Sequence, residues 1–150
     1  MKINVRVNHE WQTFHVEAEE YLLDTLRRYG YLSVRRGCDS TSCGVCTIIM
    51  DQKIVPSCSV LSVHADQHDV LTVEGIPEEA AKISDCFGNE GADQCGFCNP
   101  SLALTIYQMK RDLDHPTIDE VKHYLLGNLC RCTGYIAQEK AIMRYLEDES

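Results

Sequence analysis

Hydrophobic and polar residues alternate along the start of the chain. Ile3, Val5 and Val7 recur at every second position, and the alternation resumes after a polar turn at residues 8–10. A period of two residues is typical of a strand that buries one face. The pattern therefore predicts a β-hairpin over residues 2–17.

Apolar residues then recur with helical spacing over residues 19–29, and Gly30 follows at the position that often closes a helix. Short runs rich in β-branched residues at 46–50, 53–55 and 70–73 predict three further strands. A hairpin, a helix and then more strands is the order of a β-grasp. This half of the chain is therefore expected to be α+β.

Strand signals stop at residues 74–77, and helical periodicity takes over. Four helices are predicted beyond this point: one over 78–87, one that begins near 99, one that begins near 117, and a last one over 136–146. We therefore expect two domains in an α+β chain. A β-grasp domain would occupy residues 1–76, and an all-α four-helix domain residues 77–150.

Two of these helices carry end signals. Asn99 is expected as an N-cap, with Pro100 in the first turn. Thr117 and Glu120 have the spacing of a capping box, and Gly127 is expected to end that helix.

Composition narrows the range of partners. The formal charge of −9 and the pI of about 5.0 disfavour binding to nucleic acid or to an anionic membrane surface. No apolar stretch predicts a membrane span, and the start of the chain has no apolar core of a secretory signal. We expect a cytoplasmic protein whose cysteines stay reduced and available to metal.

Eight of the nine cysteines form two quartets. The first, with spacing C-x4-C-x2-C-x11-C, consists of Cys38, Cys43, Cys46 and Cys58. The second, with spacing C-x2-C-x31-C-x-C, consists of Cys95, Cys98, Cys130 and Cys132. Cys86 belongs to neither quartet and is expected to be a buried thiol.

Four converging thiolates are what a 2Fe–2S cluster requires, and the first three cysteines of the first quartet match the plant-type ferredoxin spacing C-x4-C-x2-C. The predicted hairpin would bring Cys46 and Cys58 together, and the positive end of a helix would favour a thiolate at Cys98. Two clusters would make the chain an electron carrier. A structural zinc site and a disulfide network are the alternatives. The six histidines show no ligand pairing, and no nucleophile–base pair, phosphate loop or dinucleotide fingerprint indicates catalysis.

The cysteine motifs resemble those of the small iron–sulfur subunit of the xanthine oxidase family of molybdenum hydroxylases. The resemblance covers nearly the whole chain. It is carried by the segments 37–46, Cys58, Gln94-Cys95-Gly96-Phe97-Cys98 and Gly127-Asn128-Leu129-Cys130-Arg131-Cys132-Thr133-Gly134-Tyr135. Thr41 stands where the family commonly has glycine.

The resemblance implies a ferredoxin-like β-grasp domain with one 2Fe–2S cluster and a helical domain with the other. It also implies two partners, a large subunit that carries molybdopterin and hydroxylates the substrate, and a medium subunit that carries FAD. The chain would relay electrons from molybdopterin to FAD, with Cys132 and Gln94 closest to the pterin and the loop around Cys43 on the flavin side. A purine or other N-heterocycle is the expected substrate class.

The sequence leaves two other functions open. A free-standing double-cluster ferredoxin would touch its partners only briefly, whereas a permanent subunit should bury a large apolar surface. A zinc-stabilised interaction module would carry no electrons.

Overall fold

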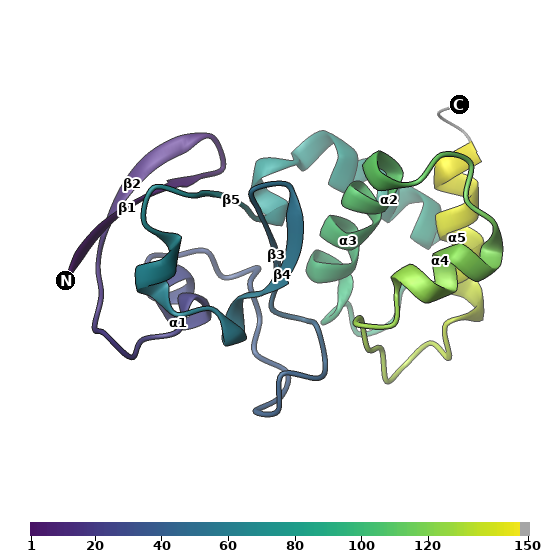
Figure 1. Ribbon diagram of the computed structural model, residues 1–150. Coiled ribbons are helices and arrows are strands. Elements are labelled where there is room, and N and C mark those ends of the chain that lie inside the picture. Colours follow the sequence, from purple (N-terminus) through teal and green to yellow (C-terminus); the bar gives the residue numbers. More distant parts are fainter. Residues whose placement is uncertain (148–150) are drawn as a thin grey trace.

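A computed structural model describes residues 1–147 (Figure 1). Strands, one α-helix and three short 3-10 helices (Ser57–Ser59, Ser62–Ala65 and Val73–Gly75) form the N-terminal half, and four α-helices form the C-terminal half. The N-terminal elements are β1 (Lys2–Val7), β2 (Glu10–His15), α1 (Leu22–Arg28), β3 (Thr47–Met50), β4 (Lys53–Pro56) and β5 (Asp69–Leu71). The C-terminal elements are α2 (Pro77–Asn89), α3 (Asn99–Asp112), α4 (Ile118–Tyr124) and α5 (Ile136–Glu147). The predicted α+β class is confirmed.

The five strands form one mixed sheet in the order β2-β1-β5-β3-β4. Two antiparallel hairpins lie at its edges, and β1 pairs in parallel with β5. Positive φ angles at Asn8 and His9, and again at Asp51 and Gln52, close the two hairpins. Such consecutive left-handed residues match the right-handed twist of the strands they join. The predicted hairpins are therefore present. β2 and β3 are shorter than expected by one or two residues, and β4 is one residue longer.

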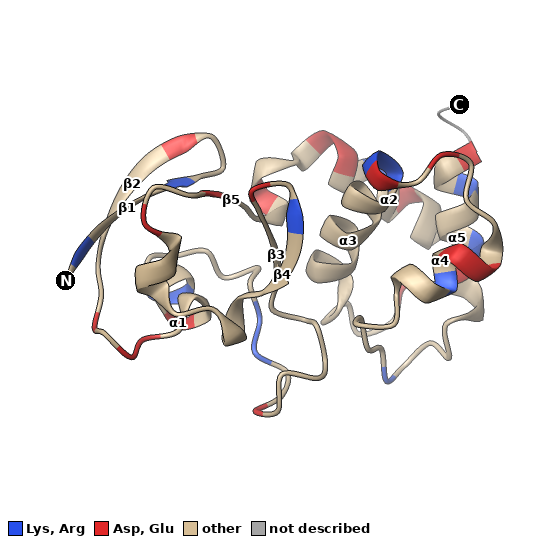
Figure 2. Cartoon of the chain, viewed as in Figure 1, with Lys and Arg blue, Asp and Glu red and all other residues tan. Residues whose placement is uncertain are grey.

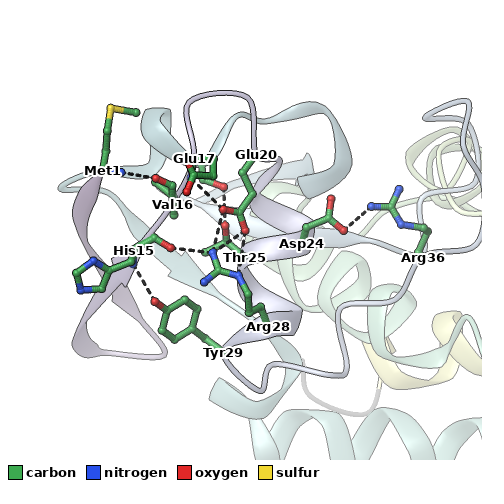
Figure 3. Close-up of polar contacts among 11 residues, drawn as sticks. Met1, His15, Val16, Glu17, Glu20, Asp24, Thr25, Arg28, Tyr29 and Arg36 are labelled. Carbon is green, nitrogen blue, oxygen red and sulfur yellow. Dashed lines mark hydrogen bonds and ion pairs between the residues drawn. The ribbon is translucent and has the colours of Figure 1, made fainter.

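The alternating face of β1 builds the core of the N-terminal half. Ile3, Val5 and Val7 are buried there together with Leu22 and Leu26 of α1. Beside this core, Arg28 of α1 binds Glu20 in the segment before the helix, as Figure 3 shows. The acidic segment 17–20 therefore forms a turn that leads into α1, and the helix begins later than predicted.

The four C-terminal helices pack around a second core. The predicted capping box is confirmed: the Thr117 hydroxyl accepts from the Glu120 N–H, and the Glu120 carboxylate accepts from the Thr117 N–H. Two expectations were wrong. Asn99 is the first residue of α3 rather than its cap: Cys98 precedes the helix at the capping position, and the Asn99 side chain contacts Asp93 and Cys98 instead. α4 ends at Tyr124, before Gly127, because the chain turns at Leu125.

A third, smaller core joins the halves. Ile49 of β3, Ile76 and Leu104 of α3 are buried against one another, so α3 lies on the sheet. Basic and acidic segments are interspersed over both halves (Figure 2). None of the helices within residues 1–147 is long and apolar enough to span a bilayer.

Candidate metal centres

The loop between α1 and β3 carries the first three cysteines of the first quartet. The Arg36 guanidinium binds the Asp24 carboxylate of α1 at 2.6 Å, which anchors the loop two residues before Cys38 (Figure 3). The backbone N–H groups of Cys43 and Ser40 point at the Cys38 sulfur and lower the pKa of that thiol to about 6. The wrapping of the loop therefore favours the thiolate form of Cys38.

The fourth cysteine reaches this loop through the β3–β4 hairpin, as predicted. The backbone N–H of Ser57 and its hydroxyl both donate to the Cys46 carbonyl, at 3.2 and 2.7 Å, which fixes Cys58 beside Cys46. Burial, followed by the neighbouring Cys46 thiol and the charges of Cys38 and Cys43, raises the pKa of Cys58 to about 12.

The four sulfurs of the first quartet are therefore close enough for the charge on one to shift the pKa of another. Burial likewise raises the pKa of Cys43, with contributions from its neighbours Cys38 and Cys46. Crowded thiols resist joint ionisation because their charges repel, and metal cations reverse that balance by binding the thiolates. This donor set fits a cationic iron centre.

The tip of the first loop is exposed and strained. Thr41 adopts a φ of +56°, in the left-handed region that a β-branched residue rarely enters. Residues 39–42 are exposed, whereas Cys43 is partly buried on the inner side of the loop. The outward-facing part of the loop around Cys43 is therefore the segment 39–42.

The second quartet comes together from two turns. Cys98 lies directly before α3, and Cys130 and Cys132 precede α5. The sulfurs of Cys95 and Cys132 lie 3.5 Å apart. Cys95 and Cys132 are exposed, and the adjacent Gln94 is exposed too. The structure thus gathers both quartets predicted from the spacing, while Cys86 lies in α2, only partly buried.

Nearby donors are directed at the sulfurs of this quartet. The Phe97 N–H donates to the Cys95 sulfur at 3.5 Å and, as the main cause, lowers the pKa of Cys95. Burial opposes ionisation of Cys130, but hydrogen bonds from Thr133, including its hydroxyl at 3.2 Å, give a net lowered pKa. Burial and the Cys130 thiol raise the pKa of Cys98 to about 11.

A cavity of about 250 Å³ lies among these thiols. It is lined by Cys95, Cys98, Cys130 and Cys132, and also by Cys43 of the first quartet. Within residues 1–147, no three His, Cys, Asp or Glu side chains surround one point closely enough for a single ion. A 2Fe–2S cluster instead takes its four thiolates as two pairs, one on each iron. The paired sulfurs and the space between them fit that group.

The two quartets are joined through the backbone. The Leu129 N–H donates to the Cys43 carbonyl at 2.9 Å. At Gly44, a Cβ would lie 1.8 Å from the Gly127 carbonyl oxygen, so only glycine allows the two segments to approach this closely. The side-chain amide nitrogen of Asn128 is buried there with no acceptor among residues 1–147. An unmet donor of this kind is consistent with a site that an anionic group completes.

Sequence reasoning missed several residues around the second quartet. Arg35, from the first half, donates to the carbonyls of Gly96 and Phe97 at 2.7 and 2.9 Å. Gln138 of α5 points its amide at the Cys98 sulfur. No pattern in the neighbouring sequence indicates the role of Arg35, because its partners lie about sixty residues away along the chain. Gln138 has a local signal, because it is a polar residue in line with the apolar stripe of its helix, at the end of that stripe.

Comparisons with known proteins agree with this chemistry. Residues 5–73 match the model of the 2Fe-2S iron-sulfur cluster binding domain, and residues 72–143 that of the [2Fe-2S] binding domain. Both matches favour iron–sulfur chemistry over structural zinc.

Relatives align over most of the chain. It is 37% identical to the nicotinate dehydrogenase small FeS subunit of Eubacterium barkeri, over 97% of this chain and 94% of that protein. It is 38% identical to the xanthine dehydrogenase iron-sulfur-binding subunit of Escherichia coli, over 76% and 74% of the two. The solved structure of quinoline 2-oxidoreductase from Pseudomonas putida superposes with a TM-score of 0.90, at 35% identity, over 98% of this chain and 94% of that one. The chain therefore belongs to the family of small 2Fe–2S iron–sulfur subunits of the xanthine oxidase, or molybdenum hydroxylase, enzymes, and is a non-catalytic electron-transfer subunit of an oxidoreductase.

Proposed function

We propose that the chain holds two 2Fe–2S clusters, one in each cysteine quartet, and relays electrons singly within a molybdenum hydroxylase. When bound, each cluster supplies a one-electron carrier. The ligands of the first would be Cys38, Cys43, Cys46 and Cys58, and those of the second Cys95, Cys98, Cys130 and Cys132. The observation that carries this proposal is the position of Cys43, which belongs to the first quartet and also lines the cavity of the second.

The protein supplies a short connection between the quartets. The bonded route runs from the Cys43 side chain to its carbonyl, across the hydrogen bond to the Leu129 N–H, and along the backbone to Cys130. It contains one hydrogen bond and is otherwise covalent. The Gly44–Gly127 contact holds the two segments together at this crossing. Such a connection favours electron exchange between the two sites within one chain.

The surface around the second quartet supports a permanent partner. Phe97, Leu129 and Ile136 are large apolar residues with exposed fractions of 45%, 48% and 67%, close in sequence to the exposed Cys95 and Cys132. Exposed apolar side chains grouped around a functional site are typical of an interface. We propose that this face, with Gln94, binds the large molybdopterin subunit.

The medium, FAD-binding subunit would then face the exposed loop 39–42 on the side of the first quartet. The proposal places the complex in the cytoplasm, where thiols remain reduced. The names of the relatives, nicotinate and xanthine dehydrogenase and quinoline 2-oxidoreductase, support an N-heterocycle as substrate of the large subunit. The free-standing ferredoxin is disfavoured because the relatives are named as subunits.

Two matched variants test the assignment. In dithionite-reduced complex, Cys43→Ser should remove one paramagnetic centre and Cys98→Ser the other, because each cysteine belongs to one quartet. Loss of both centres from each single variant would contradict two separate sites. The complex is purified from its native cells through a tag on this chain. Recovery of the tagged chain as a monomer, without a larger molybdenum protein, would contradict the permanent subunit.

A further inference from the structure

Gln138, the third residue of α5, is a buried polar side chain at the end of an apolar stripe. Ala141, Ile142 and Tyr145 follow it on the same helical face and pack in the core of the C-terminal half. Only 3% of Gln138 is exposed. Burying a side-chain amide costs free energy unless its polar atoms find partners. An amide at this position therefore calls for a specific partner.

The partner is a sulfur of the second quartet. The amide nitrogen of Gln138 donates toward the Cys98 sulfur at a distance of 3.9 Å, which is within reach of a large sulfur acceptor. Cys98 and Gln138 lie forty residues apart in sequence, on the turns that begin α3 and α5. Phe97 and Thr133, in contrast, donate to sulfurs of their own turns. Gln138 is thus the donor among these three that links the two turns.

We propose that Gln138 donates a hydrogen bond to the Cys98 thiolate and thereby raises the reduction potential of the second cluster. The inference rests on the proposed function, which makes Cys98 a ligand. One-electron reduction adds a negative charge that spreads onto the ligand sulfurs, and a donor to a ligand sulfur stabilises the reduced form more than the oxidised form. Gln138 is therefore a positioning residue. Its hydrogen bond makes the second cluster a better electron acceptor than the same cluster would be without this donor.

The test is a redox titration of the purified native complex, with each centre followed by its paramagnetic signal. Cys98→Ser identifies the signal of the second centre. Gln138→Met keeps the length of the side chain and removes the donor. In this variant the reduction potential of the second centre should fall by about 59 mV, which is a tenfold change in the equilibrium constant for a one-electron couple. The potential of the first centre should stay unchanged. Gln138→Asn retracts the amide by one methylene and should give a smaller fall.

Gln108→Met is the matched control. Gln108 is also buried in the C-terminal half, 4% exposed, but its amide donates to Asp112 at 2.8 Å and not to a sulfur. This control should leave both potentials unchanged. An unchanged potential in Gln138→Met, or an equal fall in Gln108→Met, would overturn the inference while leaving the proposed function intact. If Gln138→Met fails to assemble, Gln138→Asn decides by the same criterion. A native complex without a second centre would refute the proposed function itself, and this inference with it.

Discussion

Replacing Gly44 with alanine tests how tightly the two cysteine turns are joined. The added Cβ would lie 1.8 Å from the Gly127 carbonyl oxygen and 3.3 Å from the Asn128 Cα, so two stretches of backbone must separate. Overpacking of this kind costs about 1–3 kcal/mol, and the φ of +71° adds about 1 kcal/mol for a residue with a Cβ. Separation also weakens the hydrogen bond from Leu129 to Cys43, worth about 1 kcal/mol. We expect a loss of about 3–5 kcal/mol.

The assay is thermal unfolding of the cluster-loaded chain, followed by its visible absorbance and circular dichroism. For a chain of this size, each loss of about 1 kcal/mol in unfolding free energy lowers the thermal midpoint by about 2–4 °C. The midpoint of Gly44→Ala should therefore be lower by roughly 6–20 °C. Gly91→Ala is the matched control, because Gly91 has a φ of +65° but nothing within 4 Å of an added Cβ. Its midpoint should fall by only about 2–4 °C. Equal falls in the two variants would refute the close contact between the turns.

Three further predictions concern other parts of the chain. Thr117→Ala removes the hydroxyl of the capping box on α4 and should destabilise the protein by about 1 kcal/mol in chemical unfolding, whereas Thr117→Ser should be nearly neutral. Thr41→Gly removes left-handed strain at an exposed loop tip and should raise the free energy of unfolding slightly, by about 0.5 kcal/mol after the extra entropy of glycine is deducted; a decrease would contradict the strain. The Glu74 carboxylate is partly buried, which opposes ionisation, but hydrogen bonds from Ser33 and Thr72 give it a net lowered pKa. Its contribution to stability is therefore complete above the ordinary value of 4.5 and is lost as pH falls through the lower folded-state pKa, so Glu74→Gln should flatten that part of the stability–pH curve.

Local signals predicted the elements well. The alternation at Ile3, Val5 and Val7, the capping box at Thr117 and the order of strands and helices all reappear in the structure. The error at Asn99 is local: the helix begins one residue earlier than expected, and the Asn99 side chain bonds to Asp93 and Cys98 rather than to the first turn.

The gathering of each quartet also followed from spacing, since a hairpin and two helix ends are local devices. The relation between the quartets did not. The relative position of the quartets depends on the hydrogen bond from Leu129 to Cys43 and on the hydrogen bonds from Arg35 to the carbonyls of Gly96 and Phe97. It also depends on the absence of a side chain at Gly44. These are contacts between residues far apart in sequence, which no local pattern of residues indicates.

Iron and acid-labile sulfide, measured per chain in freshly isolated complex, test the central claim most directly. Partner subunits are first removed or corrected for by their own metal content. Two 2Fe–2S clusters require about four iron atoms and about four sulfides for each copy of this chain. About two of each would leave one quartet without a cluster and contradict the account, as would zinc in place of iron.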